Sequence, residues 1–311
     1  MVKMLETFKR IQDEVESATN GVVIDTEIFK KYYLPLIQYY IKDRENKKVD
    51  TYVIGLQGGQ GVGKTVLVTL IKLFLKSIDY KIKGFSIDDF YKSNDERLEM
   101  ARVYKGNPFY QISRGMPGTH RYIQLYDALK KAKKGKYFEV PYFDKSLYNG
   151  RGDLTDNVTP VHERQDFVIL EGWCVNIPYL ELNKFPSIMV QNEYINRVFN
   201  EIDPKQEYFK VVMGYIKQYQ KIWDLFDNKT FMLGKKIEWI EEWRAEQEER
   251  LINSKGSGMT RKEIHEFIKP FIPFTYLFYD KVARTKENMD CLLTIGREHL
   301  PEEIKIPNLI K

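Results

Sequence analysis

The chain contains 311 residues, of which 43% are hydrophobic and 30% are charged. This mixture is typical of a globular protein and excludes a disordered chain or a disulfide scaffold. Lysine and arginine number 49 against 44 acidic residues, a formal net charge of +5. Because this excess is small and spread along the chain, we do not expect nucleic-acid binding.

Features that report on location favour the cytoplasm. The two cysteines, Cys174 and Cys291, are too few for a disulfide framework and lack histidines at zinc-ligand spacing. The first twenty residues mix acids and bases without an apolar core, so no secretory signal is predicted. No apolar run reaches the roughly 18 residues of a membrane span. We expect a cytoplasmic protein with no membrane association, and the oligomeric state stays open.

The N-terminal part reads as helical. Apolar residues recur at three- and four-residue steps from about residue 25 to 43, which predicts an amphipathic helix interrupted or kinked near Pro35. The polar linker RENKKVD follows. We therefore expect an N-terminal helical segment over residues 1–50.

Strand and helix patterns alternate in the rest of the chain. Short β-branched or apolar runs predict strands over residues 51–57, 81–87, 167–175 and 291–295. Helical periodicity predicts helices over residues 64–77, 122–134, 205–226, 235–252 and 261–271. This alternation indicates an α/β fold with a mainly parallel sheet.

The strongest motif is GGQGVGKT, which fits G-x-x-x-x-G-K-[ST] without a mismatch. Its glycines let the backbone turn N–H groups inward around a triphosphate, Lys64 can reach the β- and γ-phosphates, and the Thr65 hydroxyl can bind magnesium. A predicted strand precedes it and a predicted helix follows, which is the context the motif needs. The predicted phosphate-binding residues are Gly58, Gly59, Gln60, Gly61, Val62, Gly63, Lys64 and Thr65.

Two later strands end in acidic residues. Ligands of an α/β sheet lie beyond the carboxyl ends of its strands, so Asp88 is placed to accept the proton of an attacking hydroxyl, as a small-molecule kinase requires. The alternative is that Asp88 or Asp89 only caps the next turn, and Asp89 is the better candidate for that. Glu171 ends an apolar strand and occupies the Walker-B position, which holds magnesium directly or through water. No Asn-Lys-x-Asp motif is present, so a GTPase is not favoured.

Two turn-rich polar stretches, residues 114–120 and 141–153, are expected to be loops, where binding groups concentrate. Cations there can hold an anionic substrate, and carboxylates can bind its hydroxyls. For each residue the alternative is a solvated turn. The candidate substrate ligands are Arg114, His120, Asp144, Lys145, Arg151 and Asp153.

Arg244 lies beside the apolar seam of the helix predicted over residues 235–252. Phosphoryl-transfer enzymes often bring an arginine on a mobile element to the charge of the transferring group, so Arg244 is a candidate catalytic lid residue. The alternative is a solvated helix face with charge pairs four residues apart.

Seven segments in this order resemble the D-glycerate 3-kinase family of plants and its fungal ATP-binding homologues, within the uridine-kinase and phosphoribulokinase branch of P-loop kinases. They are GGQGVGKT, SIDDFY, RGMPGTHR, PYFDKSLYNGRGD, ILEGW, WRAEQE and GMTRKEIHEFIKPFIPFTY. The resemblance runs from about residue 52 to 297. It implies a doubly wound parallel sheet of the P-loop type with helical additions, and ATP and Mg²⁺ as cofactors. It matches Asp88 to the family's base, Glu171 to its Walker-B acid and Arg244 to its lid arginine.

The expected organisation is therefore a kinase domain over residues 51–311, with substrate-binding loops at about 106–160 and a helical lid region at about 205–275. The hypothesis is that Asp88 activates an acceptor hydroxyl while Lys64, magnesium and Arg244 stabilise the γ-phosphoryl group. D-Glycerate, giving 3-phosphoglycerate, is the first acceptor to consider.

Three departures from the family pattern leave the acceptor open. Arg121 follows His120 where the family usually has Asp, Tyr142 replaces a basic residue, and Leu154 replaces the Arg usual after Arg-Gly-Asp. These changes alter the expected charge pattern of the pocket. A related uridine or pantothenate kinase is one alternative. An ATP-binding regulatory protein without transferase activity is another, although the complete set of motif residues speaks against it.

Overall fold

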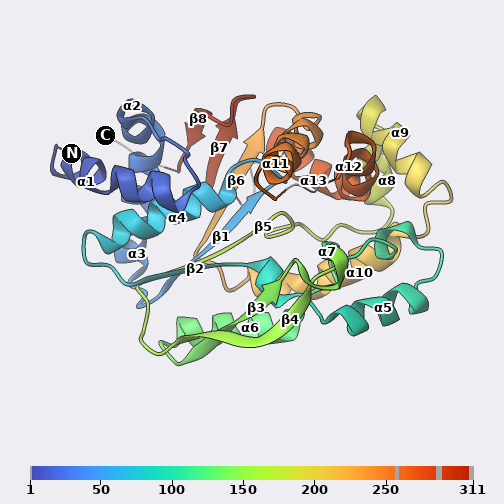
Figure 1. Ribbon diagram of the computed structural model, residues 1–311, viewed down its shortest axis with the longest axis horizontal. Coiled ribbons are helices and arrows are strands. Elements are labelled where there is room, and N and C mark those ends of the chain that lie inside the picture. Colours follow the sequence, from blue (N-terminus) through green and yellow to red (C-terminus); the bar gives the residue numbers. More distant parts are fainter. Residues whose placement is uncertain (1, 256–258, 285–288, 308–311) are drawn as a thin grey trace.

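The computed structural model describes residues 2–255, 259–284 and 289–307, and a six-stranded sheet forms its centre (Figure 1). The strand order is β2-β5-β1-β6-β7-β8. All neighbours pair in parallel except β7 and β8, which are antiparallel. The strands are β1 (Tyr52–Gly58), β2 (Ile82–Ser86), β5 (Phe167–Gly172), β6 (Asn228–Gly234), β7 (Cys291–Ile295) and β8 (Pro301–Lys305).

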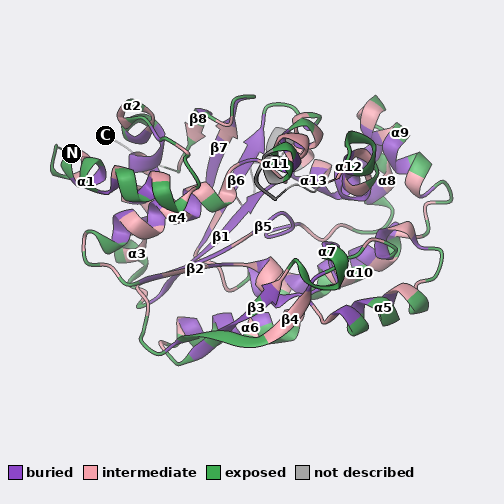
Figure 2. Ribbon diagram, in the orientation of Figure 1, coloured by how far each residue is buried: buried purple, intermediate pink, exposed green. Residues whose placement is uncertain are grey.

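Helices cover both faces of this sheet. Val53 and Val168 point into a core shared with α6 and α10, whereas Ile54 and Ile169 point into a second core shared with α1, α3 and α4. Figure 2 shows the central strands almost wholly buried between these layers. Alternate side chains of one strand thus enter opposite cores, as a doubly wound sheet requires. The expected fold class is confirmed, with β8 as an added antiparallel edge.

The described α-helices include a short one-turn element, α7, in which Tyr148 and Asn149 have left-handed backbone angles. Their bounds are α1 (Val2–Ala18), α2 (Thr26–Ile28), α3 (Leu34–Lys47), α4 (Lys64–Lys76), α5 (Asn94–Val103), α6 (Tyr122–Lys133), α7 (Leu147–Gly150), α8 (Lys184–Met189), α9 (Glu193–Ile202), α10 (Phe209–Trp223), α11 (Trp239–Lys255), α12 (Arg261–Ile268) and α13 (Ile272–Arg284). Shorter turns are the π-helical η1 (Phe29–Tyr33) and the 3₁₀ segments η2 (Ile87–Phe90), η3 (Pro108–Tyr110) and η4 (Lys269–Phe271).

The helix predicted to be interrupted or kinked near Pro35 is interrupted by a π-helical turn. The π-helical turn η1 directly precedes α3, whose first turn contains Pro35. Proline has no N–H to donate to the preceding turn, and a widened turn accommodates the missing bond. This confirms that the N-terminal helix is interrupted at this point.

Two parts of the chain differ from the expectation. The stretch 141–153 is not loop throughout, because β3 (Phe138–Asp144) and β4 (Asp153–Val161) form an antiparallel hairpin around a short turn. Most of β4 is exposed and polar, so its sequence carries no strand pattern. Strand β6 was also not predicted, because its sequence NKTFMLG has flanks of Asn, Lys and Gly, although it lies between β1 and β7.

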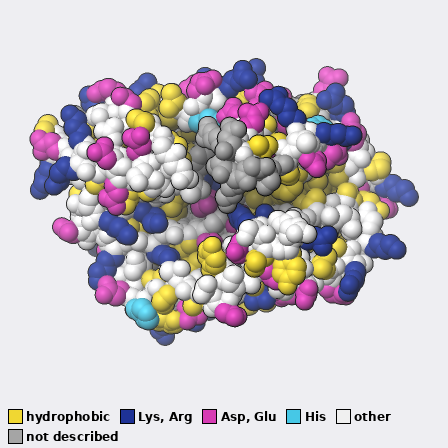
Figure 3. Space-filling model, viewed as in Figure 1, with side chains coloured by type: hydrophobic (Ala, Val, Ile, Leu, Met, Phe, Trp, Pro, Cys, Tyr) yellow, Lys and Arg dark blue, Asp and Glu magenta, His cyan; other side chains and the backbone are white. Residues whose placement is uncertain are grey.

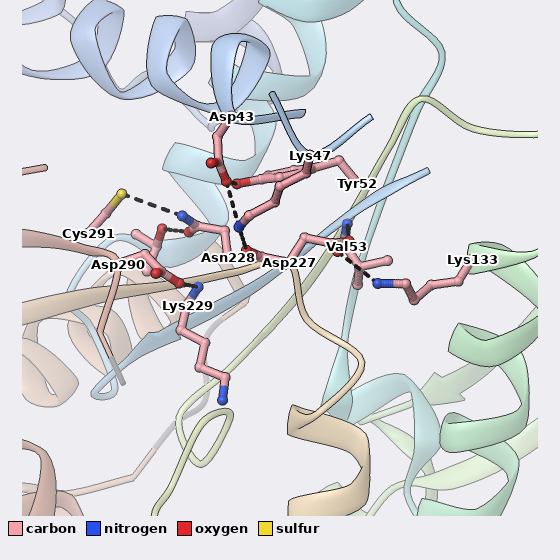
Figure 4. A network of polar contacts seen from close by, with 11 residues as sticks. Asp43, Lys47, Tyr52, Val53, Lys133, Asp227, Asn228, Lys229, Asp290 and Cys291 are labelled. Atoms are coloured by element: carbon pink, nitrogen blue, oxygen red, sulfur yellow. Dashed lines mark hydrogen bonds and ion pairs between the residues drawn. The ribbon is translucent and has the colours of Figure 1, made fainter. Parts of the chain in front are cut away.

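A polar network joins the N-terminal segment to the end of the sheet where β1 and β6 begin (Figure 4). Asp227 accepts from the Val53 backbone N–H and from Lys133 Nζ, both at 2.8 Å. Lys47 of α3 donates to the Asp227 carbonyl at 2.5 Å and pairs with Asp43 at 2.8 Å. These contacts bind the N-terminal segment, residues 1–50, to the sheet. Its boundary as a separate segment stays a prediction.

Cys174 and Cys291 are both buried and free. Among the described residues, none of the helices is both long and apolar enough to cross a membrane.

Candidate functional site

The glycine-rich loop connects β1 to α4 at the carboxyl end of the parallel strands. Gly61 and Gly63 have φ of +78° and +98°, a region that favours glycine. Gly63 is the N-cap residue of α4, and no side chain caps this end of the helix. The backbone N–H groups of the first turn of α4 are therefore available to an anion. Lys64 Nζ donates to the Gly59 carbonyl at 3.0 Å and thus lies within the loop. Burial lowers the pKa of Lys64, while Glu171 opposes this shift.

Two distant segments pack directly on this loop. A Cβ atom on Gly61 would lie 2.5 Å from Cβ of Trp243 on α11. Nδ1 of His299, from the β7–β8 connection, lies 2.9 Å from the Gly61 carbonyl, and its Nε2 lies 2.8 Å from Glu246. His299 was not predicted as a site residue. A lone histidine in a polar turn carries no local signal for this contact.

A cavity of about 550 Å³ adjoins the loop, a size common for small-molecule sites. Lys64 and Thr65 lie at its edge, and the N-terminal segment, α11 and the β7–β8 connection complete its walls. Its apolar lining includes Ile24, Ile28, Val62, Met232 and Trp243.

Asp88 lies on η2, directly after β2. Lys145 Nζ lies 2.7 Å from its Oδ2, and the Tyr91 hydroxyl also donates to it. Burial alone raises the pKa of Asp88, but Lys145, His120 and Tyr91 lower it to about 2. Asp88 is therefore ionised and held between donors.

Glu171 is the penultimate residue of β5, which lies between β1 and β2. It pairs in register with Leu56 and with Ser86. Burial raises the pKa of Glu171, and the charge of Lys64 opposes this shift. Thr65, in the first turn of α4, is exposed next to the loop. These oxygen donors are few, which suits Mg²⁺ held largely by substrate phosphates and water. Among the described residues, no group of three or more His, Cys, Asp or Glu side chains could hold a metal ion.

The β3–β4 hairpin turn is held by Arg97, which was not predicted as a site residue, and by Asp153 and Asp144, which were. Buried Arg97 donates to the carbonyls of Arg151 and Gly152 at 2.7 and 2.5 Å. Asp153 accepts from the Asn94 backbone N–H at 2.9 Å. Within the turn, Asp144 accepts from the backbone N–H of Ser146 at 2.8 Å. The contacts of Asp153 and Asp144 therefore shape the hairpin, while the Arg151 side chain is exposed.

His120 lies one layer behind the open site. It is fully buried, its ring stacks on Tyr91 at 4.6 Å, and its Nδ1 lies 3.0 Å from the Tyr219 hydroxyl. Burial lowers the pKa of His120 to about 4, although Asp88 opposes the shift. The imidazole is thus neutral at pH 7.

Two arginines from distant segments act on each other across the site. Arg114 donates to the Gly150 carbonyl, and Arg244 pairs with Glu248. Burial lowers the pKa of Arg244, Glu248 raises it, and the charge of Arg114 lowers it further. Arg244 therefore lies within electrostatic reach of Arg114, and its role as a lid residue stays a prediction.

The structure shows the contacts of the three residues that depart from the family pattern. Arg121 forms an ion pair with Glu96 of α5 at 2.7 Å, so its charge is compensated by a residue other than Asp88. Tyr142 is 52% exposed, and Leu154 pairs in register with Phe143 in the hairpin. Figure 3 shows this face hollowed between the part that carries α11 and α12 and the part that carries the hairpin, with acidic and basic side chains around the hollow.

No family model matches the chain. The "Uncharacterized kinase mug58" of Schizosaccharomyces pombe is 30% identical over 257 residues, which cover 80% of this chain and 88% of that protein. The "D-glycerate 3-kinase, chloroplastic" of Arabidopsis thaliana is 27% identical over 78% of this chain. The match covers 52% of the plant enzyme, so the chain spans about half its length. The solved D-glycerate 3-kinase from Cryptococcus neoformans var. grubii superposes with a TM-score of 0.78 at 22% identity, over 87% of this chain and 97% of that one.

Proposed function

We propose a specific activity on the premise that this chain belongs to the kinase family of mug58 and the D-glycerate 3-kinases. It is accordingly an ATP-dependent phosphotransferase that acts on a hydroxyl group. The acceptor we propose is D-glycerate, with 3-phosphoglycerate as the product. The names of two similar proteins support this choice.

In this proposal the loop residues 58–65 hold the phosphates of ATP, and the adjoining cavity takes the nucleoside. Lys64 and Arg244 compensate the charge that moves with the γ-phosphoryl group. Thr65 and Glu171 hold Mg²⁺, which when bound neutralises and orients the phosphates.

Asp88 accepts the proton of the acceptor hydroxyl as that oxygen bonds to the γ-phosphorus and the bond to the β-phosphate oxygen breaks. Arg114 and Lys145 hold the acceptor's carboxylate, since both are cations at the hairpin turn and the charge of Arg114 acts on Lys145. The remaining predicted substrate-side residues are His120, Asp144, Arg151 and Asp153. His120 acts from behind Tyr91. Asp144 and Asp153 act through the hairpin turn.

The observation that carries the proposal is the convergence of Lys64, Asp88, Lys145 and Glu171. They come from four separate segments. Lys145 lies 2.7 Å from Asp88, and the charges of Asp88 and Lys145 also act on the pKa values of Lys64 and Glu171. A phosphate-binding lysine, a carboxylate beside it and cations on the far side are the parts that phosphoryl transfer to an anionic alcohol requires.

An acceptor screen tests this function. Purified protein with ATP and Mg²⁺ is given D-glycerate, L-glycerate, glycerol, uridine or pantothenate, and ADP release and the phosphorus NMR spectrum are recorded. We expect 3-phosphoglycerate from D-glycerate alone. Transfer to uridine or pantothenate and not to glycerate would replace the proposed acceptor. ATP binding without transfer to any acceptor would favour a regulatory protein.

We also propose a cytoplasmic location, which the two free cysteines support.

A further inference from the structure

The ammonium of Lys145 neutralises the carboxylate of the proposed base. Lys145 reaches Asp88 from the hairpin turn, 57 residues further along the chain. Its side chain is 56% exposed and that of Asp88 is 27% exposed. The pair therefore lies at the open side of the site, where a flexible lysine stem can change partner without disturbing the core.

Asp88 in this pair is a poor base. Burial alone raises its pKa, yet Lys145 and its other donors hold the pKa down to about 2. A carboxylate this acidic has little tendency to take a proton from a hydroxyl. Because burial favours the protonated form, departure of the ammonium would make Asp88 more basic.

Arg114 is a second cation at the hairpin turn that carries Lys145, since it donates to the Gly150 carbonyl of that turn. Its described contacts are the carbonyl of Gly150 and the ring of Phe143, neither of which neutralises its charge. Asp88 raises the pKa of Lys145, whereas the charge of Arg114 opposes this. An anion placed between the two cations would relieve their repulsion and would compete with Asp88 for Lys145.

We propose that the acceptor's carboxylate takes Lys145 from Asp88 and thereby frees the base. This inference rests on the proposed function. A short hydroxy acid binds its carboxylate between Lys145 and Arg114 and presents its hydroxyl to Asp88. The hydroxyl proton then passes to Asp88, the oxygen bonds to the γ-phosphorus, and the ADP oxygen leaves with the electron pair of the broken bond. Water and neutral alcohols do not displace Lys145, so the exchange selects anionic acceptors and limits ATP hydrolysis.

Three variants test the exchange. Lys145→Met removes the charge and keeps the length, and Lys145→Arg keeps the charge. Lys81→Met is the matched control, because Lys81 also forms an exposed ion pair, at 2.6 Å with Glu163, and its side chain is 58% exposed. Thermal unfolding first establishes that each variant is folded.

The readouts are calorimetric binding of D-glycerate without nucleotide, ADP release without acceptor, and kcat and KM for D-glycerate and glycerol. For Lys145→Met we expect the affinity for glycerate to fall, and the KM for glycerate to rise, at least about tenfold. ADP release without acceptor should rise severalfold, and activity on glycerol should not fall. Lys145→Arg should restore glycerate binding, and Lys81→Met should match the unchanged protein.

Unchanged glycerate binding in Lys145→Met overturns the inference. Unchanged or reduced ADP release without acceptor also overturns it, because Lys145 would then not restrain the base. These failures differ from failure of the proposed function, in which the unchanged protein itself transfers nothing to glycerate.

Discussion

The Asp89 carboxylate accepts a hydrogen bond from the Ser86 backbone N–H at 2.9 Å. In return, the Ser86 hydroxyl accepts from the backbone N–H of Asp88 at 3.1 Å. This capping box closes around η2, so one acid of the pair serves the turn while the other faces Lys145. The prediction that Asp89 caps the turn is confirmed.

The two neighbouring acids should therefore respond differently to substitution. Asp88→Asn should lower kcat by about 10²-fold or more, because the hydroxyl proton loses its acceptor, with ATP binding nearly intact. Asp89→Ala should instead cost about 1 kcal/mol of stability through loss of the cap. Steady-state kinetics and urea unfolding of both variants measure the contrast. Full turnover in Asp88→Asn would show that Asp88 is not the base.

His120 should make the stability of the protein depend on pH. Burial lowers its pKa from 6.5 to about 4 in the fold, so the unfolded chain binds the proton more readily. Its contribution is complete above pH 6.5 and is lost as the pH falls toward 4, by up to about 3 kcal/mol. The groups that act on it are Asp88, Lys92 and Arg97.

Urea unfolding of the unchanged protein and of His120→Phe and His120→Gln, at pH 7 and pH 4.5, measures this contribution. Both variants should lose less stability on acidification than the unchanged protein does. An equal loss in all three proteins would show that His120 is not buried in its neutral form.

Gly61 and Gly21 form a matched pair for the glycine-rich loop. Both have positive φ, +78° and +85°, so alanine costs about 1–2 kcal/mol of backbone strain at either position. Only at Gly61 would the added Cβ meet Trp243; at Gly21 nothing lies within 4 Å. Gly61→Ala should therefore be the less stable variant and should also weaken binding of a fluorescent ATP analogue. Equal effects at the two positions would contradict the close packing of α11 on the loop.

Arg114 and Arg121 should differ in their effect on the acceptor. Arg121 pairs with Glu96 at the surface, so Arg121→Ala should change KM for D-glycerate less than about threefold and stability by at most about 1 kcal/mol. Arg114→Met should raise that KM at least about tenfold, because a cation beside Lys145 is lost. A larger effect at Arg121 would place the acceptor on the α5 side of the site.

Arg244 should act on the chemical step. Arg244→Met should lower kcat by about 10²-fold or more, with a smaller change in KM for ATP, because its charge is needed as the phosphoryl group moves. Arg261→Met is the control, since Arg261 forms an exposed pair with Glu249 on the same helical region. An unchanged kcat in Arg244→Met would show that Arg244 takes no part in the chemical step and serves only as the ion-pair partner of Glu248.

Local patterns were sufficient for much of the fold. Strand β7 has the bounds that its apolar run predicts, and the interruption before Pro35 follows from proline's missing donor. The resemblance to a kinase family was equally readable, because its motifs are continuous in the chain. Strand β6 and the β3–β4 hairpin were missed, because β6 becomes buried only between two other strands, and β4 is paired but remains exposed.

The sequence by itself determined the phosphate loop, since its glycines, Lys64 and Thr65 lie within eight consecutive positions. It also placed Asp88 and Glu171 at the carboxyl ends of strands. Only the tertiary structure decided that Lys145 pairs with Asp88 and that His299 contacts Gly61. Those partners lie 57 and 238 residues apart. The physical reason is that a pairing over such distances depends on how the hairpin, α11 and the sheet edge pack, which no local pattern of residues encodes.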